Sequence, residues 1–128
     1  MIGIVVVSHS RKLAEGVLEL AKMMAPTANI SVAGGLEDGS MGTSFAKISQ
    51  AIDEVYSDDG VVVLMDMGSA VMTTEMVIES MEGGKIKMLD CPIVEGAIVA
   101  ALESLLGATM EDLEEKVAET CTMKKINS

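Results

Sequence analysis

The chain has 128 residues, a formal net charge of −11 and 49% apolar residues, which suits one compact domain spanning residues 1–128. The negative charge opposes binding to a polyanion, and with one Tyr, one Phe and no Trp there are few rings on which bases could stack, so we expect no nucleic-acid partner. Every apolar run is far shorter than the ~20 residues of a membrane span, and no signal-peptide pattern opens the sequence. We therefore expect a cytoplasmic protein with no membrane partner.

The first half of the chain alternates between segments of strand and helix character. The apolar run over residues 2–7 predicts a strand, and the helical spacing of apolar residues over 11–24 predicts a helix that ends before Pro26. A second strand is expected over 29–33. It leads into the glycine-rich stretch GGLEDGSMGTS, after which Thr43 or Ser44 can cap a helix that runs to about residue 55.

The second half repeats this alternation. Residues 60–65 are uniformly apolar and predict a third strand, and the segment DMGSA leads from it into a helix over about 70–81 that stops at Gly83-Gly84. A fourth strand is expected over 85–89, followed by Cys91-Pro92 and a fourth helix. A last amphipathic helix covers roughly 110–123.

This order of elements predicts the α/β class. Strands that alternate with helices form a parallel sheet with helices on both faces and right-handed crossovers. We expect an open parallel sheet of at least four strands in the order 2-1-3-4. In that order the chain leaves strand 1 in one direction and returns on its other side, so a crevice opens at the carboxyl ends of strands 1 and 3. Ligand chemistry is expected in this crevice.

The fourth helix, VEGAIVAALESLLG, is apolar over most of its circumference. A helix of this kind needs cover on two sides. One interpretation is that a second subunit supplies the cover, which predicts a homodimer. The alternative is that the helix lies between the sheet and the terminal helix of its own chain.

Two residues at the mouth of this crevice carry the candidate chemistry. His9, the one histidine, follows strand 1, and Asp66 follows strand 3. A carboxylate can accept the hydrogen on one imidazole nitrogen and leave the other nitrogen as a free nucleophile. Imidazole is largely neutral at cellular pH, so it can attack phosphorus without prior deprotonation. The pair therefore predicts a histidine that accepts a phosphoryl group.

Hydrogen-bond donors for such a group are expected around the crevice. Helices begin near Ser10 and near Ser69, and helix amino ends offer free N–H groups to anions. The hydroxyl of Thr43, near the end of the glycine-rich stretch, can add another donor. Plain helix capping is the competing interpretation for the hydroxyl residues. Met41 and Met67 lie in loops beside the crevice, where flexible thioethers suit a contact surface that meets two different proteins.

Several other chemistries lack their motifs. No G-x-x-x-x-G-K-[ST] or G-x-G-x-x-G occurs, which disfavours autonomous ATP hydrolysis and dinucleotide binding. One histidine cannot build a multi-histidine metal site, so we expect no metal in this chain, and no G-x-S-x-G supports a serine hydrolase. The spacing of Cys91 and Cys121 fits no zinc motif. The remaining chemistry is a histidine that receives and passes on a group.

Four segments carry a resemblance to a known family: GIVVVSHSRKLAEGVLELAKMM, GGLEDGSMGTS, VVVLMDMGSAVMTTEM and LDCPIVEGAIVAA. Together they resemble the phosphotransfer subunits of phosphoenolpyruvate-dependent dihydroxyacetone kinases, which are relatives of the mannose-type enzyme IIA domains of the bacterial sugar phosphotransferase system. The resemblance covers nearly the whole chain.

The resemblance implies a phosphoryl relay. His9 would be phosphorylated by the phosphocarrier HPr and would pass the group to ADP held on a separate nucleotide-binding subunit. Magnesium and ADP are then expected on that partner, and no cofactor is expected on this chain. Asp66 matches the aspartate that supports the histidine, and Thr43, Gly68 and Ser69 match the surrounding loops. Family members are dimers. Some relatives carry HPr-like domains in the same chain, so a separate HPr is expected here.

Two alternatives remain open. The chain could be a mannose-type enzyme IIA that passes phosphate to the IIB component of a sugar transporter. It could also be a regulatory or dimerisation module whose phosphorylation state a partner senses. MDMGSA and VEG favour the kinase subunit, and turnover by an acceptor would distinguish a carrier from a sensor.

Overall fold

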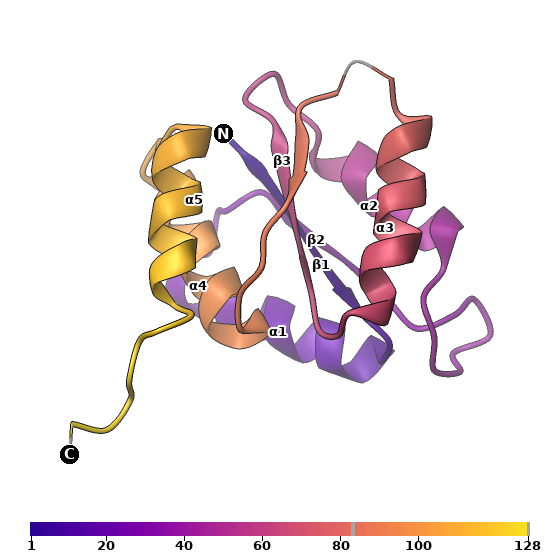
Figure 1. The fold of residues 1–128 in the computed structure, drawn as a ribbon, viewed down its shortest axis with the longest axis horizontal. Helices are drawn as coiled ribbons and strands as arrows, with labels where there is room; N and C mark the ends of the chain where they lie inside the picture. The colour runs from indigo at the N-terminus through magenta and orange to yellow at the C-terminus, as the bar shows by residue number, and fades with distance from the viewer. Residues whose placement is uncertain (83, 128) are drawn as a thin grey trace.

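A four-stranded parallel sheet forms the centre of the molecule (Figure 1). The structure, a computed structural model, describes residues 1–82 and 84–127. The strands are β1 (Gly3–Ser8), β2 (Ile30–Gly34), β3 (Val61–Met65) and β4 (Ile86–Met88). The helices are α1 (Arg11–Met24), α2 (Phe45–Val55), α3 (Ser69–Ser80), α4 (Ile93–Leu105) and α5 (Met110–Glu119).

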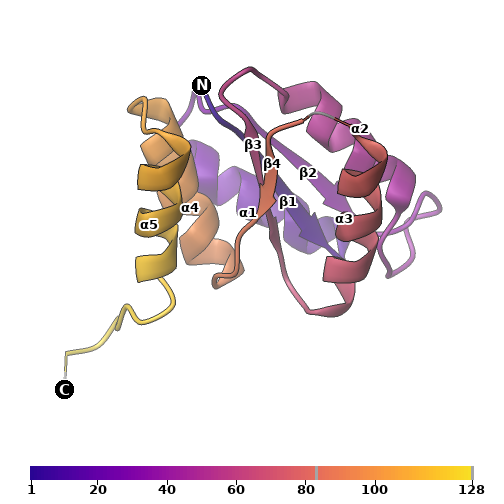
Figure 2. The ribbon, with the colours of Figure 1, turned by 45° about the horizontal axis from the view of Figure 1, so that its top comes forward.

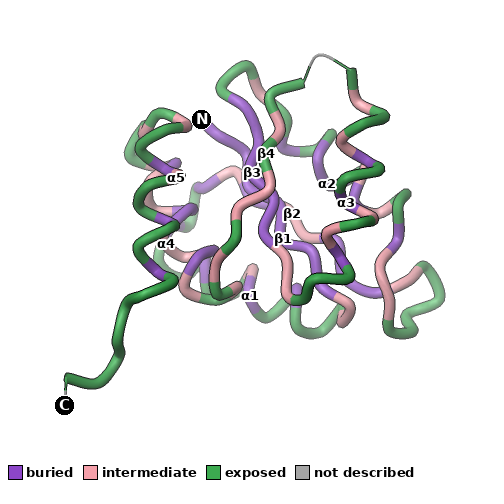
Figure 3. Tube along the Cα trace, in the orientation of Figure 1, coloured by how far each residue is buried: buried purple, intermediate pink, exposed green. Residues whose placement is uncertain are grey.

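The sheet has the strand order β2-β1-β3-β4, so the predicted order is confirmed. All three strand pairs are parallel, and Val7 of β1 is paired with Met65 of β3. Every residue of β1 is buried, as is most of β3, because both strands have neighbours on each side and helices on each face (Figure 3). The residues that follow these two central strands therefore lie side by side at the carboxyl ends of the strands.

Helices cover the sheet on both faces (Figures 1 and 2). On one face, α1, α4 and α5 enclose an apolar core that includes Ile4, Val6, Leu64 and Leu113. On the other face, α2 and α3 cover a second core built on the alternate residues of the same strands, such as Val5 and Val63. This alternation follows from the two-residue period of a strand and accounts for the continuous apolar runs in β1 and β3.

The apolar helix α4 finds its cover within the chain. It lies between α1 and α5 and also packs on β1 and β3. Its buried residues are small, among them Gly96, Ala97 and Ala100, and a Cβ on Gly96 would collide with the Cys91 side chain. The second cover is therefore α5, as in the alternative interpretation, and the apolar character of α4 does not require a second subunit.

Helix α5 ends earlier than the sequence indicates. We expected it to run to about Met123, but it stops at Glu119, and the Thr120 hydroxyl donates a hydrogen bond to the Val117 carbonyl at the helix end. Residues 121–127 are exposed. The third helix was predicted to stop at Gly83-Gly84; α3 ends at Ser80, before Gly84, and Gly83 lies outside the described residues. Within the described part of the chain, no helix has the length and apolar character needed to cross a lipid bilayer.

Candidate active site

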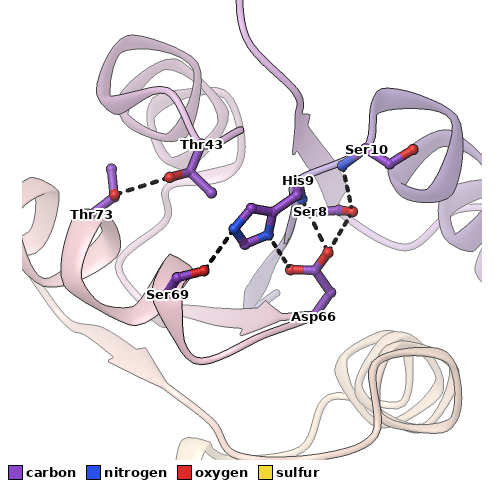
Figure 4. Close-up of polar contacts among 7 residues, drawn as sticks. All are labelled: Ser8, His9, Ser10, Thr43, Asp66, Ser69 and Thr73. Carbon is purple, nitrogen blue, oxygen red and sulfur yellow. Dashed lines mark hydrogen bonds and ion pairs between the residues drawn. The ribbon is translucent and has the colours of Figure 1, made fainter. Parts of the chain in front are cut away.

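His9 and Asp66 face each other across the ends of β1 and β3. The ring nitrogen Nδ1 of His9 lies 3.0 Å from Oδ1 of Asp66 (Figure 4). The parallel register produces this contact, because Val7 is opposite Met65 and the next residues continue side by side. The histidine side chain is 21% exposed and the aspartate side chain 13%. The pair predicted from the sequence is thus brought together at the edge of the sheet.

Three donors converge on the Asp66 carboxylate. Besides the His9 ring, Oδ2 accepts hydrogen bonds from the Ser8 hydroxyl at 2.9 Å and from the His9 backbone N–H at 3.0 Å. Burial on its own would raise the pKa of Asp66, but these hydrogen bonds and the adjacent His9 outweigh it and hold the pKa below its usual range. Asp66 is therefore an ionised carboxylate, which can only accept hydrogen bonds.

The charge of Asp66 determines which nitrogen of His9 carries the hydrogen. Because Asp66 is an acceptor, Nδ1 must be the donor, and in the neutral ring Nε2 then keeps its lone pair. Nε2 lies 2.7 Å from the hydroxyl oxygen of Ser69, so the hydroxyl donates to that lone pair. Ser69 is the exposed first residue of α3. The free nucleophile predicted from the sequence is Nε2, on the side of the ring away from Asp66.

The glycine-rich stretch after β2 is hydrogen-bonded to the backbone of His9. The N–H of Gly42 donates to the His9 carbonyl at 3.0 Å, which ties the stretch to the end of β1. Gly35 and Gly39 adopt φ values of 70° and 87°, which side-chain-bearing residues rarely adopt, so the tight path depends on glycine. Thr43 follows and its Oγ1 lies 3.0 Å from Oγ1 of Thr73 in α3.

The predicted phosphate-binding residues fall into two groups. Ser69 and Thr43 lie on the Nε2 side of the ring (Figure 4). Gly68 precedes α3, and its N–H and that of Ser69 have no hydrogen-bond partner in the described part of the chain, so both remain available to an anion. Ser10 differs: its hydroxyl accepts from the Leu13 N–H and caps α1, and its own N–H donates to the Ser8 hydroxyl. The structure does not bring the Ser10 side chain to Nε2.

Two further residues contribute to the site and were not predicted from the sequence. Ser8 is fully buried, donates to Asp66 and accepts from Ser10, so it orients the carboxylate. Thr73 contacts Thr43. A sequence signal exists for Thr73, because it stands four residues after Ser69 and residues four apart share one helix face. For Ser8 the signal is weaker, since a small hydroxyl residue ends many strands.

One cavity lies away from His9. It has a volume of about 560 Å³ and lies at the opposite edge of the sheet, lined by Met1, Lys85 and Met110 among others. A second cavity of about 370 Å³ borders Asp66, Met67 and Cys91. The chemistry of His9 and Asp66 and the strand order, not an enclosed volume, mark the candidate site, because a nucleophile that receives a small group needs to be accessible.

Cys91 borders the cavity beside Asp66, and its thiol is held in the protonated form. Burial raises the pKa of its thiol to about 12, with Cys121 and Asp90 adding to the shift, so the thiol stays protonated. Both cysteines are free. Among residues 1–82 and 84–127 no group of three or more His, Cys, Asp or Glu side chains has the geometry of a metal site.

Comparison with known proteins adds to this geometry. The sequence profile of the EIIA-man family, described as "PTS system fructose IIA component", matches residues 3–114. The chain belongs to the EIIA-man family. The family predicted from the four sequence segments is thereby confirmed, and the topology of the sheet agrees with it.

Two curated EIIA-man relatives are phosphotransfer subunits. The chain is 36% identical over 115 residues to the "PTS-dependent dihydroxyacetone kinase, phosphotransferase subunit DhaM" of Lactococcus lactis, covering 90% of this chain and 92% of that protein. It is also 36% identical over 118 residues to the "PEP-dependent dihydroxyacetone kinase, phosphoryl donor subunit DhaM" of Escherichia coli, covering 87% of this chain but 25% of that protein. The chain thus spans nearly all of one relative and a quarter of the other.

A solved structure shows the same EIIA-man fold. The phosphotransferase system component EIIA from Streptococcus agalactiae superposes with a TM-score of 0.74 at 21% identity, covering 99% of this chain and 97% of that one. At this identity the likeness concerns the fold alone.

Proposed function

We propose that the chain is a phosphohistidine carrier that accepts a phosphoryl group from phospho-HPr on His9 and passes it to ADP bound on the nucleotide-binding subunit of a dihydroxyacetone kinase. One observation carries this proposal: the His9 ring is fixed through Nδ1 by the Asp66 carboxylate, while Nε2 faces Ser69 at the surface. The DhaM relatives are named as subunits of dihydroxyacetone kinases, which supports the choice of donor system and acceptor.

Phosphoryl transfer to His9 is a substitution at phosphorus in which one P–N bond replaces another. The Nε2 lone pair forms a bond to phosphorus while the bond from phosphorus to the donor's nitrogen breaks, and the electron pair of that bond stays on the donor's ring. Nδ1 keeps its hydrogen throughout and keeps donating it to Asp66. The phosphorylated ring is more cationic than the free ring, so the adjacent carboxylate stabilises it. The Ser69 hydroxyl leaves Nε2 and becomes free to donate to a phosphoryl oxygen.

Four features complete the proposal. This chain binds no cofactor, and magnesium and ADP stay on the acceptor subunit, because a protein of net charge −11 repels free nucleotide. The chain works in the cytoplasm, and electrostatic steering comes from basic patches on its partners.

Met41 and Met67, 74% and 54% exposed, belong to the contact surface around His9. The chain is a homodimer, as the family resemblance implies.

The central experiment reconstitutes the relay from purified parts. With enzyme I, HPr and phosphoenolpyruvate, we expect one acid-labile phosphoryl group for each chain, seen by intact-protein mass spectrometry. Addition of the kinase's ADP-loaded subunit should remove it within seconds. Removal by a sugar-transporter IIB component instead would favour the mannose-type alternative, and a label that neither acceptor removes would favour a sensor. Absence of any label would refute the proposal.

The homodimer needs a separate measurement, because α4 is covered within the chain and gives no argument for a second subunit. Sedimentation equilibrium over a range of concentrations should give twice the 13.4 kDa mass of the chain. A monomer at every concentration would exclude this part of the proposal and leave the carrier function unaffected.

A further inference from the structure

Thr73 lies on the face of α3 that is turned toward the active site. It follows Ser69 by one helical turn, so the two side chains share a face, and Ser69 already touches Nε2 of His9. Thr73 is half-buried, and its hydroxyl oxygen lies 3.0 Å from that of Thr43 (Figure 4). This hydroxyl pair joins α3 to the glycine-rich stretch, the two segments that flank the nitrogen to be phosphorylated.

The Thr43 and Thr73 hydroxyls together have one hydrogen that their mutual bond does not use. Each hydroxyl has one hydrogen to donate, and the bond between Thr43 and Thr73 uses one of the two. A phosphoryl group has oxygen acceptors and therefore takes up the remaining hydrogen. Thr43 lies next to Gly42, whose N–H is bonded to the His9 carbonyl, so Thr43 is the member of the pair tied to the histidine. Both hydrogens are used whichever hydroxyl donates within the pair. When Thr73 donates to Thr43, the hydrogen left for the phosphoryl oxygen is on Thr43, the residue tied to the histidine.

We propose that Thr73 is a positioning residue for the phosphoryl group on His9, acting through the hydroxyl of Thr43. Thr73 holds the Thr43 oxygen as an acceptor, so the Thr43 hydrogen points away from α3 and toward the group on Nε2. A chain of two hydrogen bonds also strengthens the donor at its end. This inference rests on the proposed function, since it concerns the phosphorylated form of His9.

The neighbouring Thr74 provides a matched control. It is fully buried in the same helix, and its hydroxyl oxygen has no hydrogen-bond partner in the described part of the chain. Replacement by the isosteric valine therefore removes the same atom from the adjacent position without breaking a contact. An effect that arises from threonine loss in α3 in general would occur at both positions.

The test is a double-mutant cycle with Thr43→Val, Thr73→Val and the double variant, together with Thr73→Ser and Thr74→Val. Each variant is mixed with equimolar phospho-HPr freed of enzyme I and phosphoenolpyruvate, and the exchange equilibrium is read by mass spectrometry. For Thr73→Val we expect the equilibrium constant for phosphoryl transfer from phospho-HPr to be about three- to tenfold lower, the factor that corresponds to the loss of one hydrogen bond. Thr73→Ser and Thr74→Val should match the wild type. The double variant should equal Thr43→Val alone.

Either of two results overturns the inference: a wild-type constant for Thr73→Val, or a Thr73→Val effect that persists in full when Thr43 is already valine. Thermal unfolding checks that each variant is folded, and Thr73→Ala replaces Thr73→Val if the latter is not. Because the constant compares folded molecules only, a purely structural role would leave it unchanged.

A second phosphoryl donor separates this inference from the proposed function. Phosphoramidate transfers its phosphoryl group without a protein partner: the bond from phosphorus to its nitrogen breaks, the bond to Nε2 forms, and ammonia leaves. If the wild type reacts with phosphoramidate but not with phospho-HPr, the proposed donor is wrong, and the order of the variants' initial rates still tests Thr73. The expected order is wild type equal to Thr73→Ser, then Thr73→Val, with the double variant equal to Thr43→Val. Equal rates for all five variants and the wild type would overturn the inference.

Discussion

The two sides of the His9 ring are built differently. On the Nδ1 side, Asp66 receives three hydrogen bonds, and one of its donors, Ser8, is fully buried. On the Nε2 side a single hydrogen bond comes from Ser69, an exposed residue at the start of a helix. The first side is a closed network at the ends of two central strands. The second side consists of a helix terminus and a loop held together by the Thr43 and Thr73 hydroxyls.

This difference matches the two demands on a carrier. The ring must keep one orientation and one tautomer through many cycles, and a satisfied, half-buried network does this. The reactive nitrogen must exchange its partner twice in each cycle, and one exposed hydrogen bond costs little to break. The effects of substitutions on the two sides of the ring should therefore differ in size and in the property that changes.

The largest effect is expected from removing the ring itself. His9→Gln keeps an amide of similar size at the end of β1 but has no nucleophilic nitrogen, so phosphorylation by phospho-HPr should be abolished. Intact-protein mass spectrometry measures the incorporated phosphoryl group, and circular dichroism confirms the fold. Label retained in this variant would mean that another residue accepts the group.

The next largest effect is expected on the Nδ1 side, from Asp66→Asn. The amide can donate to Nδ1, which favours the tautomer with hydrogen on Nε2 and so blocks the nucleophile. We expect a phosphorylation rate lower by about 10²-fold or more, in line with wrong-tautomer effects in other histidine sites. Asp90→Asn makes the same change after β4, at the border of the same cavity, and serves as the matched control. Equal rates for the two variants would show that Asp66 does not select the tautomer.

The lowered pKa of Asp66 also predicts a pH dependence of stability. A carboxyl whose pKa is lower in the folded chain than its ordinary value of 3.8 stabilises the fold fully above 3.8 and loses this contribution as pH falls through the folded pKa. Urea unfolding between pH 5 and pH 2 should therefore show the wild type losing its stability advantage over Asp66→Asn toward the acid end. If the difference in stability between the wild type and Asp66→Asn stayed constant across this pH range, the lowered pKa of Asp66 would be contradicted.

On the Nε2 side, Ser69→Ala should have a smaller effect of a different kind. It removes one donor to the phosphoryl group and leaves the tautomer unchanged, so the exchange equilibrium with phospho-HPr should shift toward the donor by about three- to tenfold. Ring ¹⁵N chemical shifts should still report hydrogen on Nδ1, whereas Asp66→Asn should change them. Ser69→Thr keeps the hydroxyl and is the control. A tautomer change in Ser69→Ala would contradict the division between the two sides.

The smallest effect on transfer is expected from Ser8→Ala. Asp66 keeps its two bonds from His9, so the transfer rate should stay within about twofold, since these two bonds still fix the ring. Stability should fall by about 1–2 kcal/mol, because the part-buried contact with the Ser10 N–H and one contact with the carboxylate are lost. Urea unfolding measures the loss. A large drop in transfer rate with unchanged stability would reverse this expectation.

The two sides also differ in how well the sequence predicts them. The Nδ1 side depends on strand order, and the apolar runs of β1 and β3 identify both strands, so His9 and Asp66 can be paired from the sequence alone. The Nε2 side depends on how a loop folds against a helix. The helix start predicts Ser69, but the sequence does not show that the hydroxyl of Thr43 meets that of Thr73, because loop paths depend on contacts distant in the sequence.

Two further expectations show the same limit. Ser10 was predicted to bind phosphate because it begins a helix beside the crevice, yet its hydroxyl caps α1. A serine that caps its own helix and a serine that binds a ligand from the start of a helix have the same sequence pattern. Similarly, the apolar circumference of α4 shows that the helix needs cover but does not show whether α5 or a second chain supplies it.

The parallel pairing of β1 with β3 has a consequence for changes in chain length. An extra residue inside β1 would displace His9 by about 3.3 Å along the strand and turn its side chain to the opposite face of the sheet. An extra residue between Glu37 and Ser40, at the exposed tip of the glycine-rich stretch, moves neither His9 nor Asp66. Homologous chains should therefore vary in length at this tip and keep a constant spacing from Gly3 to His9.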